Sequence, residues 1–215
     1  WSMTLKTIQY YSRCVKKPTD IFVGGVMATL LGDEIRSETN STIISGLLDQ
    51  PGILDKGDKT IVDGLIPDYQ MLDSLEYSYG VNDAYIAYAT RGCPNNCDFC
   101  AVNKIEPCFK HYVPLKKQIK AIDRVYGQKQ DLLLLDNNVL ASDSFERIIN
   151  DIKTLGFERG STLNNKQRHV DFNQGLDARR LSEKKMVLLS ETAIRPLRIA
   201  FDDISMKDLY TSKIR

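Results

Sequence analysis

The sequence predicts an α/β fold, and two observations support this prediction. Short apolar runs alternate with amphipathic helical patterns along the second two-thirds of the chain. The alternation has the spacing of strand–helix–strand units, which form parallel sheets with right-handed crossovers. A hydrophobic content of 42% in 215 residues is ordinary for a globular protein and is sufficient for a buried core.

The chain begins with a helical pattern. Apolar residues at roughly helical spacing up to Val15 predict a helix, and Pro18 ends it. Residues 20–23 then predict a short buried strand. Gly24 and Gly25 follow this strand, where they allow either a tight turn into the next helix or a close approach of the backbone to a ligand.

A connection divides the chain into two expected domains. Residues 50–80 are rich in Asp, Gly and Pro, which is typical of a linking segment rather than of a packed element. We therefore expect residues 1–75 to form the first domain and residues 76–215 the second. The chain opens on Trp1 within a helical pattern and has no initiator methionine, so we expect a fragment of a longer protein.

The second domain is predicted to alternate strands and helices. The first helix starts at Pro114 and stops at Gly127, the second has a capping-box signal in Asp143 and Glu146, and Ser182 caps the third. The second strand is a run of leucines, which predicts burial on both faces. The predicted strands are 85–89, 132–135, 169–175 and 197–201.

Three cysteines directly after the first of these strands form the most specific motif of the chain. Cys93, Cys97 and Cys100 have the spacing C-x3-C-x2-C. Three thiolates this close together can hold one face of a metal cluster and leave one metal position without a protein ligand. Soft sulfur ligands select iron–sulfur clusters, zinc or copper(I). Catalytic groups of βα barrels lie at the carboxyl ends of the strands, where this loop is expected.

Other interpretations of the cysteines stay open. A structural zinc site or surface thiols without a metal would also use them, although zinc sites usually have paired C-x2-C units or histidines. Cys108 lies too far along the chain for the motif. We expect it to be a small buried apolar residue, with a fourth cluster ligand as the alternative.

The segment from Ala89 to Cys100, with the aromatic Phe99 just before the last cysteine, resembles the cluster loop of the radical S-adenosylmethionine (radical SAM) superfamily. The resemblance implies a 4Fe-4S cluster on Cys93, Cys97 and Cys100, with SAM chelating the fourth iron. It implies reductive cleavage of SAM to a 5′-deoxyadenosyl radical that abstracts hydrogen from an unknown substrate, and an external flavodoxin- or ferredoxin-like electron donor. The fold it implies is a partial (β/α)6-type barrel of about four βα units.

The resemblance also implies residues that bind SAM. Phe99 matches a position near the SAM adenine. Asp136 and Asn138 stand where the family often has Gly-Gly-Glu after the second strand, which contacts the SAM amino group. Oxygens of a carboxylate and an amide can accept from an ammonium. The alternative for Asn138 and its neighbour Asn137 is a turn cap after the strand.

Two further candidates come from the third and fourth strands. Gln174, with Asn173, Asp177 and Arg179, belongs to a polar cluster just past the third strand. Arg198 resembles the strand arginine of coproporphyrinogen-dehydrogenase-like members, where it faces SAM, and its guanidinium suits a carboxylate. The alternative for Arg198 is an ion pair with Asp171 or Asp202.

The first domain carries a second resemblance. Residues 21–31 and 43–46 resemble the last βαβ elements of the Rossmann-like cobalamin-binding domain that precedes the radical SAM barrel in one subgroup. In that family a histidine upstream of this segment ligates cobalt. The two histidines of this chain, His111 and His169, fall in the other domain. Cobalamin therefore has no support beyond the resemblance, and a degenerate domain without corrin is the alternative.

Charge and cysteine usage bear on partners and compartment. The net charge is +1, but residues 101–130 hold seven bases and two acids, which leaves a nucleic-acid partner open as an alternative. There is no secretory signal and no long apolar span, so no membrane partner is expected. Five cysteines in such a chain are typical of the reducing cytoplasm. A non-enzymatic iron–sulfur or zinc module is the alternative to an enzyme.

Overall fold

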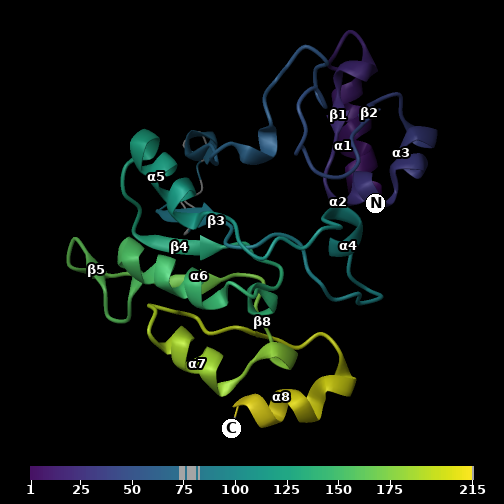
Figure 1. The fold of residues 1–215 in the computed structure, drawn as a ribbon. Coiled ribbons are helices and arrows are strands. Elements are labelled where there is room, and N and C mark those ends of the chain that lie inside the picture. Colours follow the sequence, from purple (N-terminus) through teal and green to yellow (C-terminus); the bar gives the residue numbers. More distant parts are fainter. Residues whose placement is uncertain (73–75, 77–80, 82, 215) are drawn as a thin grey trace. The chain divides into compact units, whose positions relative to one another are not determined.

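The computed structural model describes residues 1–72, 76, 81 and 83–214, which form a mixed α/β structure with small parallel sheets (Figure 1). The chain divides into two compact units. The first comprises Trp1–Leu65 with Asn95–Pro107, and the second comprises Ile66–Pro94 with Cys108–Arg215. The predicted boundary after residue 75 lies outside the described residues. The observed division falls after Leu65, and each unit is described by itself.

The first unit contains one βαβ arrangement. Its two strands pair in parallel, with Phe22 opposite Thr42. The core consists of Ile8, Ala28 and Ile35. In order, the elements are α1 (Ser2–Ser12), a 3-10 turn (Pro18–Asp20), β1 (Phe22–Val23), α2 (Val26–Leu30), α3 (Gly32–Glu38), β2 (Thr42–Ile43), a 3-10 turn (Val62–Gly64) and, from the second segment, α4 (Val102–Ile105).

The predicted first helix and the strand after it are present, but the strand is not buried as expected. Phe22 is 48% exposed. The sheet has only two strands of two residues each, so the small core can cover only one of its faces. Gly25 caps α2 with φ of 89°, a conformation that favours glycine, so the glycine pair makes the tight turn.

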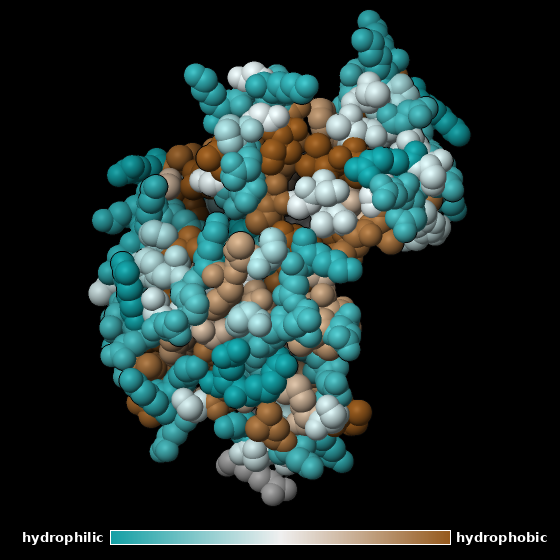
Figure 2. Space-filling view, turned by 45° about the vertical axis from the view of Figure 1, so that its right-hand side comes forward, coloured by the Kyte–Doolittle hydropathy of each residue, from teal (hydrophilic) through white to brown (hydrophobic). Residues whose placement is uncertain are grey.

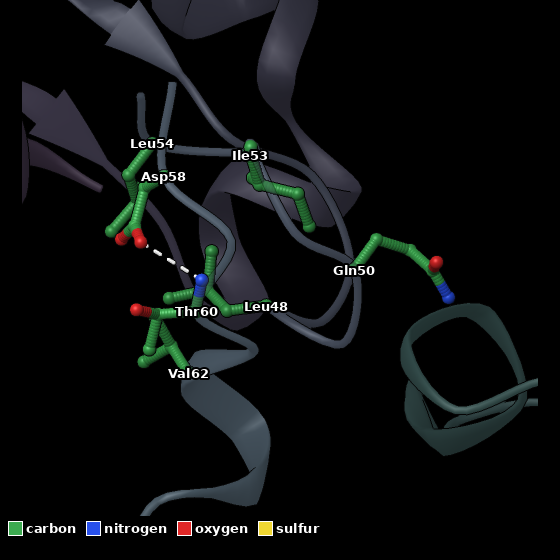
Figure 3. Close-up of a pocket in the computed structure, with 8 residues that line it drawn as sticks. Leu48, Gln50, Ile53, Leu54, Asp58, Thr60 and Val62 are labelled. Carbon is green, nitrogen blue, oxygen red and sulfur yellow. Dashed lines mark hydrogen bonds between the residues drawn. The ribbon is translucent and has the colours of Figure 1, made fainter. Parts of the chain in front are cut away.

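The connection from Leu48 to Val62 curls around a small hollow (Figure 3). The Asp58 carboxylate accepts a hydrogen bond from the Thr60 amide at 2.8 Å and fixes one turn of this loop. The space open to the centre of a water molecule is about 10 Å³, which is enough for one water and too little for a cofactor.

The second unit is built on a three-stranded parallel sheet in the order β3-β4-β7, as predicted. Tyr85 lies opposite Leu132, which in turn lies opposite Val170. Two of the helices, α5 and α6, pack against each other and α5 packs on β3. The elements are β3 (Ala84–Ala87), α5 (Leu115–Tyr126), β4 (Asp131–Leu134), α6 (Phe145–Ile152), β7 (Val170–Phe172), α7 (Glu183–Ser190) and α8 (Lys207–Ile214).

The leucine run of β4 is buried on one face only. Leu132 and Leu134 lie in the core, whereas Leu133 and Leu135 are half-buried. Successive side chains of a strand point to opposite faces, and the helices cover one of them. The main apolar cluster of this unit includes residues of all three strands. The visible face of the molecule carries both hydrophilic and hydrophobic areas (Figure 2). No helix of the described residues has the length and apolarity needed to cross a membrane.

The helix ends test the predicted caps. Pro114 precedes α5 and Gly127, with φ of 74°, ends it, and the Ser182 hydroxyl accepts from the Lys185 amide at the start of α7, all as predicted. The prediction that Asp143 and Glu146 form a capping box was wrong. Ser144 is the cap residue of α6, and its amide donates to the Ser142 hydroxyl at 2.9 Å. The Asp143 amide donates instead to a histidine ring nitrogen.

A π-turn follows α6. The α-helix stops at Ile152 and continues as a π-turn (Lys153–Phe157). Gly156 interrupts it with φ of 82°.

The fourth predicted strand does not join the central sheet. β9 (Ile199–Ala200) pairs in parallel with β8 (Leu176–Asp177) as a separate two-stranded sheet. The predicted strand 169–175 ends at Phe172, and a turn at Gly175, with φ of 80°, leads into β8. The second unit also contains a hairpin that was not predicted, β5 (Thr162–Leu163) with β6 (Lys166–Gln167). Its turn residues Asn164 and Asn165 have positive φ. Two adjacent asparagines are a hairpin-turn signal that could have predicted it. In the described part of this unit there are also four 3-10 turns: Tyr69–Leu72, Val139–Ala141, Ala178–Arg180 and Ile204–Met206.

Candidate functional site

The candidate site lies where β3 and β4 end, because parallel strands bring their carboxyl ends to the same edge of a sheet. Asp136, just beyond β4, is only 4% exposed. Its carboxylate accepts hydrogen bonds from the Ala89 amide at 3.1 Å, from the Thr90 hydroxyl at 2.6 Å and from the Thr90 amide. Burial raises the pKa of Asp136 to about 6. These bonds hold the start of the cysteine loop to the neighbouring strand.

Asn138 contacts the first cysteine of the motif. The Asn138 side chain is buried, with 3% exposed. Its Nδ2 donates to Asp177 Oδ2 at 2.9 Å and to Cys93 Sγ at 3.5 Å. Its Oδ1 is buried and has no hydrogen-bond partner among the described residues. The side chain does not cap the turn that follows it, in contrast to the alternative kept open from the sequence.

Asp177 links this group to the end of β8. Its carboxylate is 8% exposed and accepts from the Arg179 amide at 3.0 Å and from Arg179 Nε at 2.7 Å. Arg180 Nε lies 3.9 Å from its other oxygen. Asp177 thus joins two exposed arginines and the buried Asn138 in one polar network.

The three cysteines are divided between the two units. Cys93 belongs to the second unit, and Cys97 and Cys100 belong to the first, where the Cys100 amide donates to the Cys97 carbonyl at 3.0 Å. None of the three is in a disulfide within the described part of the chain. In the described part of the chain, no three His, Cys, Asp or Glu side chains are grouped so that they could hold a metal ion. The metal site therefore stays a prediction.

Three further predicted site residues, Phe99, Gln174 and Arg198, have exposed side chains. Phe99 is 67% exposed. Gln174 is exposed and donates to Asn173 at 3.4 Å. Arg198 donates from Nε and Nη2 to the two oxygens of Asp171, at 3.0 and 3.1 Å. This is one of the two ion pairs that the sequence left open for Arg198.

Cys108 corrects another expectation. It was predicted to be buried, but its side chain is exposed. It lies between α4 and the bridge that Lys110 forms with Arg91, outside the apolar clusters of both units. The apolar character of a thiol does not predict the exposure of Cys108, because the path of the loop decides whether this side chain is buried.

Comparisons with protein-family models, with curated proteins and with solved structures found no match for the chain. The fold and the site define an α/β protein in which a cysteine-rich loop leaves a parallel strand beside a buried polar network. Any more specific function has to be argued from these residues.

Proposed function

We propose that the chain is part of a radical SAM enzyme and that its second unit is a portion of the (β/α)6-type barrel. One observation carries the proposal. The first cysteine of a C-x3-C-x2-C loop follows a parallel strand and accepts a hydrogen bond from Asn138, which follows the neighbouring strand. In this arrangement Cys93, a ligand of the cluster, and Asn138, a polar group for SAM, come from the ends of adjacent strands.

The residues present fit a 4Fe-4S cluster and SAM. Cys93, Cys97 and Cys100 form no disulfide in the described structure, and cysteine thiolates are the ligands of such clusters. The buried Asn138 Oδ1 is an acceptor without a partner in the described structure, which suits the SAM ammonium group. The chemistry that a reduced cluster supplies when bound is the reductive cleavage of SAM to methionine and a 5′-deoxyadenosyl radical.

The protein's own residues would position these groups. Asp136 holds the start of the loop through Ala89 and Thr90, so in this proposal it orients the cysteines rather than binding SAM. Asn138 would accept from the SAM ammonium. Only two of the five N–H donors of Arg198 bond to Asp171, so others are available for the SAM carboxylate.

The proposal predicts an effect of Arg198 on SAM binding. We expect Arg198→Ala to weaken the affinity of the full-length protein for SAM about tenfold or more, because a charge-assisted contact to the carboxylate is lost. Equilibrium dialysis of the cluster-loaded protein measures this. Asp171→Asn is the matched control, since it weakens the ion pair but keeps the guanidinium. Equal SAM affinity in Arg198→Ala and wild type would mean that Arg198 pairs with Asp171 and does not contact SAM.

The decisive experiment is anaerobic reconstitution of the full-length protein with iron and sulfide, followed by addition of SAM and dithionite. The proposal expects 5′-deoxyadenosine by liquid chromatography. An intact cluster without 5′-deoxyadenosine, or zinc in place of iron after purification with iron supplied, would favour a non-enzymatic metal-binding module.

A further inference from the structure

We propose that Asp177 is a positioning residue that fixes the amide of Asn138, so that Asn138 Oδ1 faces the ammonium group of SAM. The inference rests on the proposed function and deepens it. It assigns a role to a carboxylate at the end of β8 that is 39 residues away from Asn138 in sequence.

The two ends of the Asn138 side chain have different partners. An amide has a donor end and an acceptor end, and the two differ only by a flip of the group. Here both Nδ2 hydrogens have an acceptor, because Nδ2 lies 2.9 Å from Asp177 Oδ2 and 3.5 Å from Cys93 Sγ. A flipped amide would place Oδ1 against a carboxylate oxygen and a sulfur. Asp177 therefore selects one orientation of Asn138.

Asp177 is itself held in place. Its Oδ1 accepts from both the Arg179 amide and Arg179 Nε, and its Oδ2 accepts from Asn138 Nδ2, with Arg180 Nε 3.9 Å away. An ionised carboxylate only accepts, so it pairs with the NH2 end of the amide and not with the oxygen. Arg179 supplies the positive charge that offsets burial of this carboxylate.

In this orientation the Asn138 amide oxygen is the atom that lacks a hydrogen-bond partner. Asn138 Oδ1 is buried without a partner in the part of the chain that the structure describes. Buried polar atoms are nearly always hydrogen-bonded, so an exception needs an explanation. A donor from a ligand would satisfy Oδ1, and the only ammonium that the proposed function brings beside Cys93 is that of SAM.

The test compares two ligands in the cluster-loaded, full-length protein. We expect Asp177→Asn to weaken SAM binding about tenfold, because the amide of Asn138 is no longer held in one orientation. Binding of 5′-methylthioadenosine, which has no amino group, should stay within twofold of wild type. Asp151→Asn is the matched control. Asp151 is also a buried carboxylate, and it accepts from Tyr112 and Lys116 away from this network.

A swapped pair gives an independent arm. In Asn138→Asp/Asp177→Asn, the new amide at position 177 can donate to one oxygen of the new carboxylate at position 138. The other carboxylate oxygen is then left for the ammonium. We expect SAM affinity to return to within about threefold of wild type. If Asp177→Asn alone does not fold, this variant carries the test, and a folded swapped pair that does not bind SAM overturns the inference.

The outcomes separate this inference from the proposed function. Unchanged SAM affinity in Asp177→Asn, or equal loss of both ligands, overturns the role of Asp177 while wild-type SAM binding upholds the proposed function. A wild-type protein that carries the cluster and binds no SAM overturns both.

Discussion

Replacing Cys97 with alanine is expected to abolish the iron–sulfur cluster of the reconstituted protein, because two thiolates cannot retain a 4Fe-4S unit. The expected loss is nearly complete in bound iron, acid-labile sulfide and visible absorbance. Cys108→Ala is the matched control, since Cys108 is a free and exposed thiol outside the motif and its removal should leave all three measurements unchanged.

The same two variants test whether one iron is open. With three protein ligands, added SAM should perturb the electron paramagnetic resonance signal of the reduced cluster in wild type and in Cys108→Ala alike. A structural site with four cysteine ligands gives the opposite pattern. Cys108→Ala would then bleach the cluster, and SAM would leave the spectrum of the wild type unchanged.

The predictions that were confirmed depend on residues close together in sequence. The apolar runs that became β3, β4 and β7 carry their own signal, and so do the local stops at Pro114 and Gly127. A parallel α/β arrangement follows from such local units. The resemblance of the cysteine loop, which stays a prediction, also depends on neighbouring residues, from Ala89 to Cys100.

What the sequence could not predict depends on partners far along the chain. The start of α6 is arranged by His111, whose carbonyl accepts from the Ser142 hydroxyl and whose ring accepts from the Asp143 amide. Likewise, the oxygens of Asp136 bond to residues 46 and 47 positions earlier, so a carboxylate that seemed suited to a ligand is engaged by the chain. Two-residue strands such as β8 and β9 are too short to have a periodic pattern.

Removal of the Asp136 carboxylate is expected to cause the largest loss of stability among the site variants. Asp136→Ala would leave the Ala89 and Thr90 amides and the Thr90 hydroxyl as donors without their buried acceptor. Each such donor costs about 1–3 kcal/mol, so we expect a loss on the order of 3 kcal/mol or more in the free energy of unfolding. Asp136→Asn should lose far less, because an amide oxygen at the Oδ1 position can keep these bonds. Urea denaturation followed by circular dichroism measures both variants.

The pH dependence of this comparison tests the buried charge. Burial raises the pKa of Asp136 from 3.8 to about 6, so the folded protein favours the protonated carboxyl. The stability that this proton provides is complete below about pH 4 and is lost as the pH rises through 6. A shift of about two units corresponds to roughly 3 kcal/mol. The Asn variant does not titrate at this position, so wild type should lose up to about this amount relative to Asp136→Asn between pH 4 and pH 7.5. If the difference in stability between wild type and Asp136→Asn stays constant over this range, burial does not penalise the Asp136 carboxylate. If the Ala and Asn variants lose equal stability, the hydrogen bonds of Asp136 do not hold the loop.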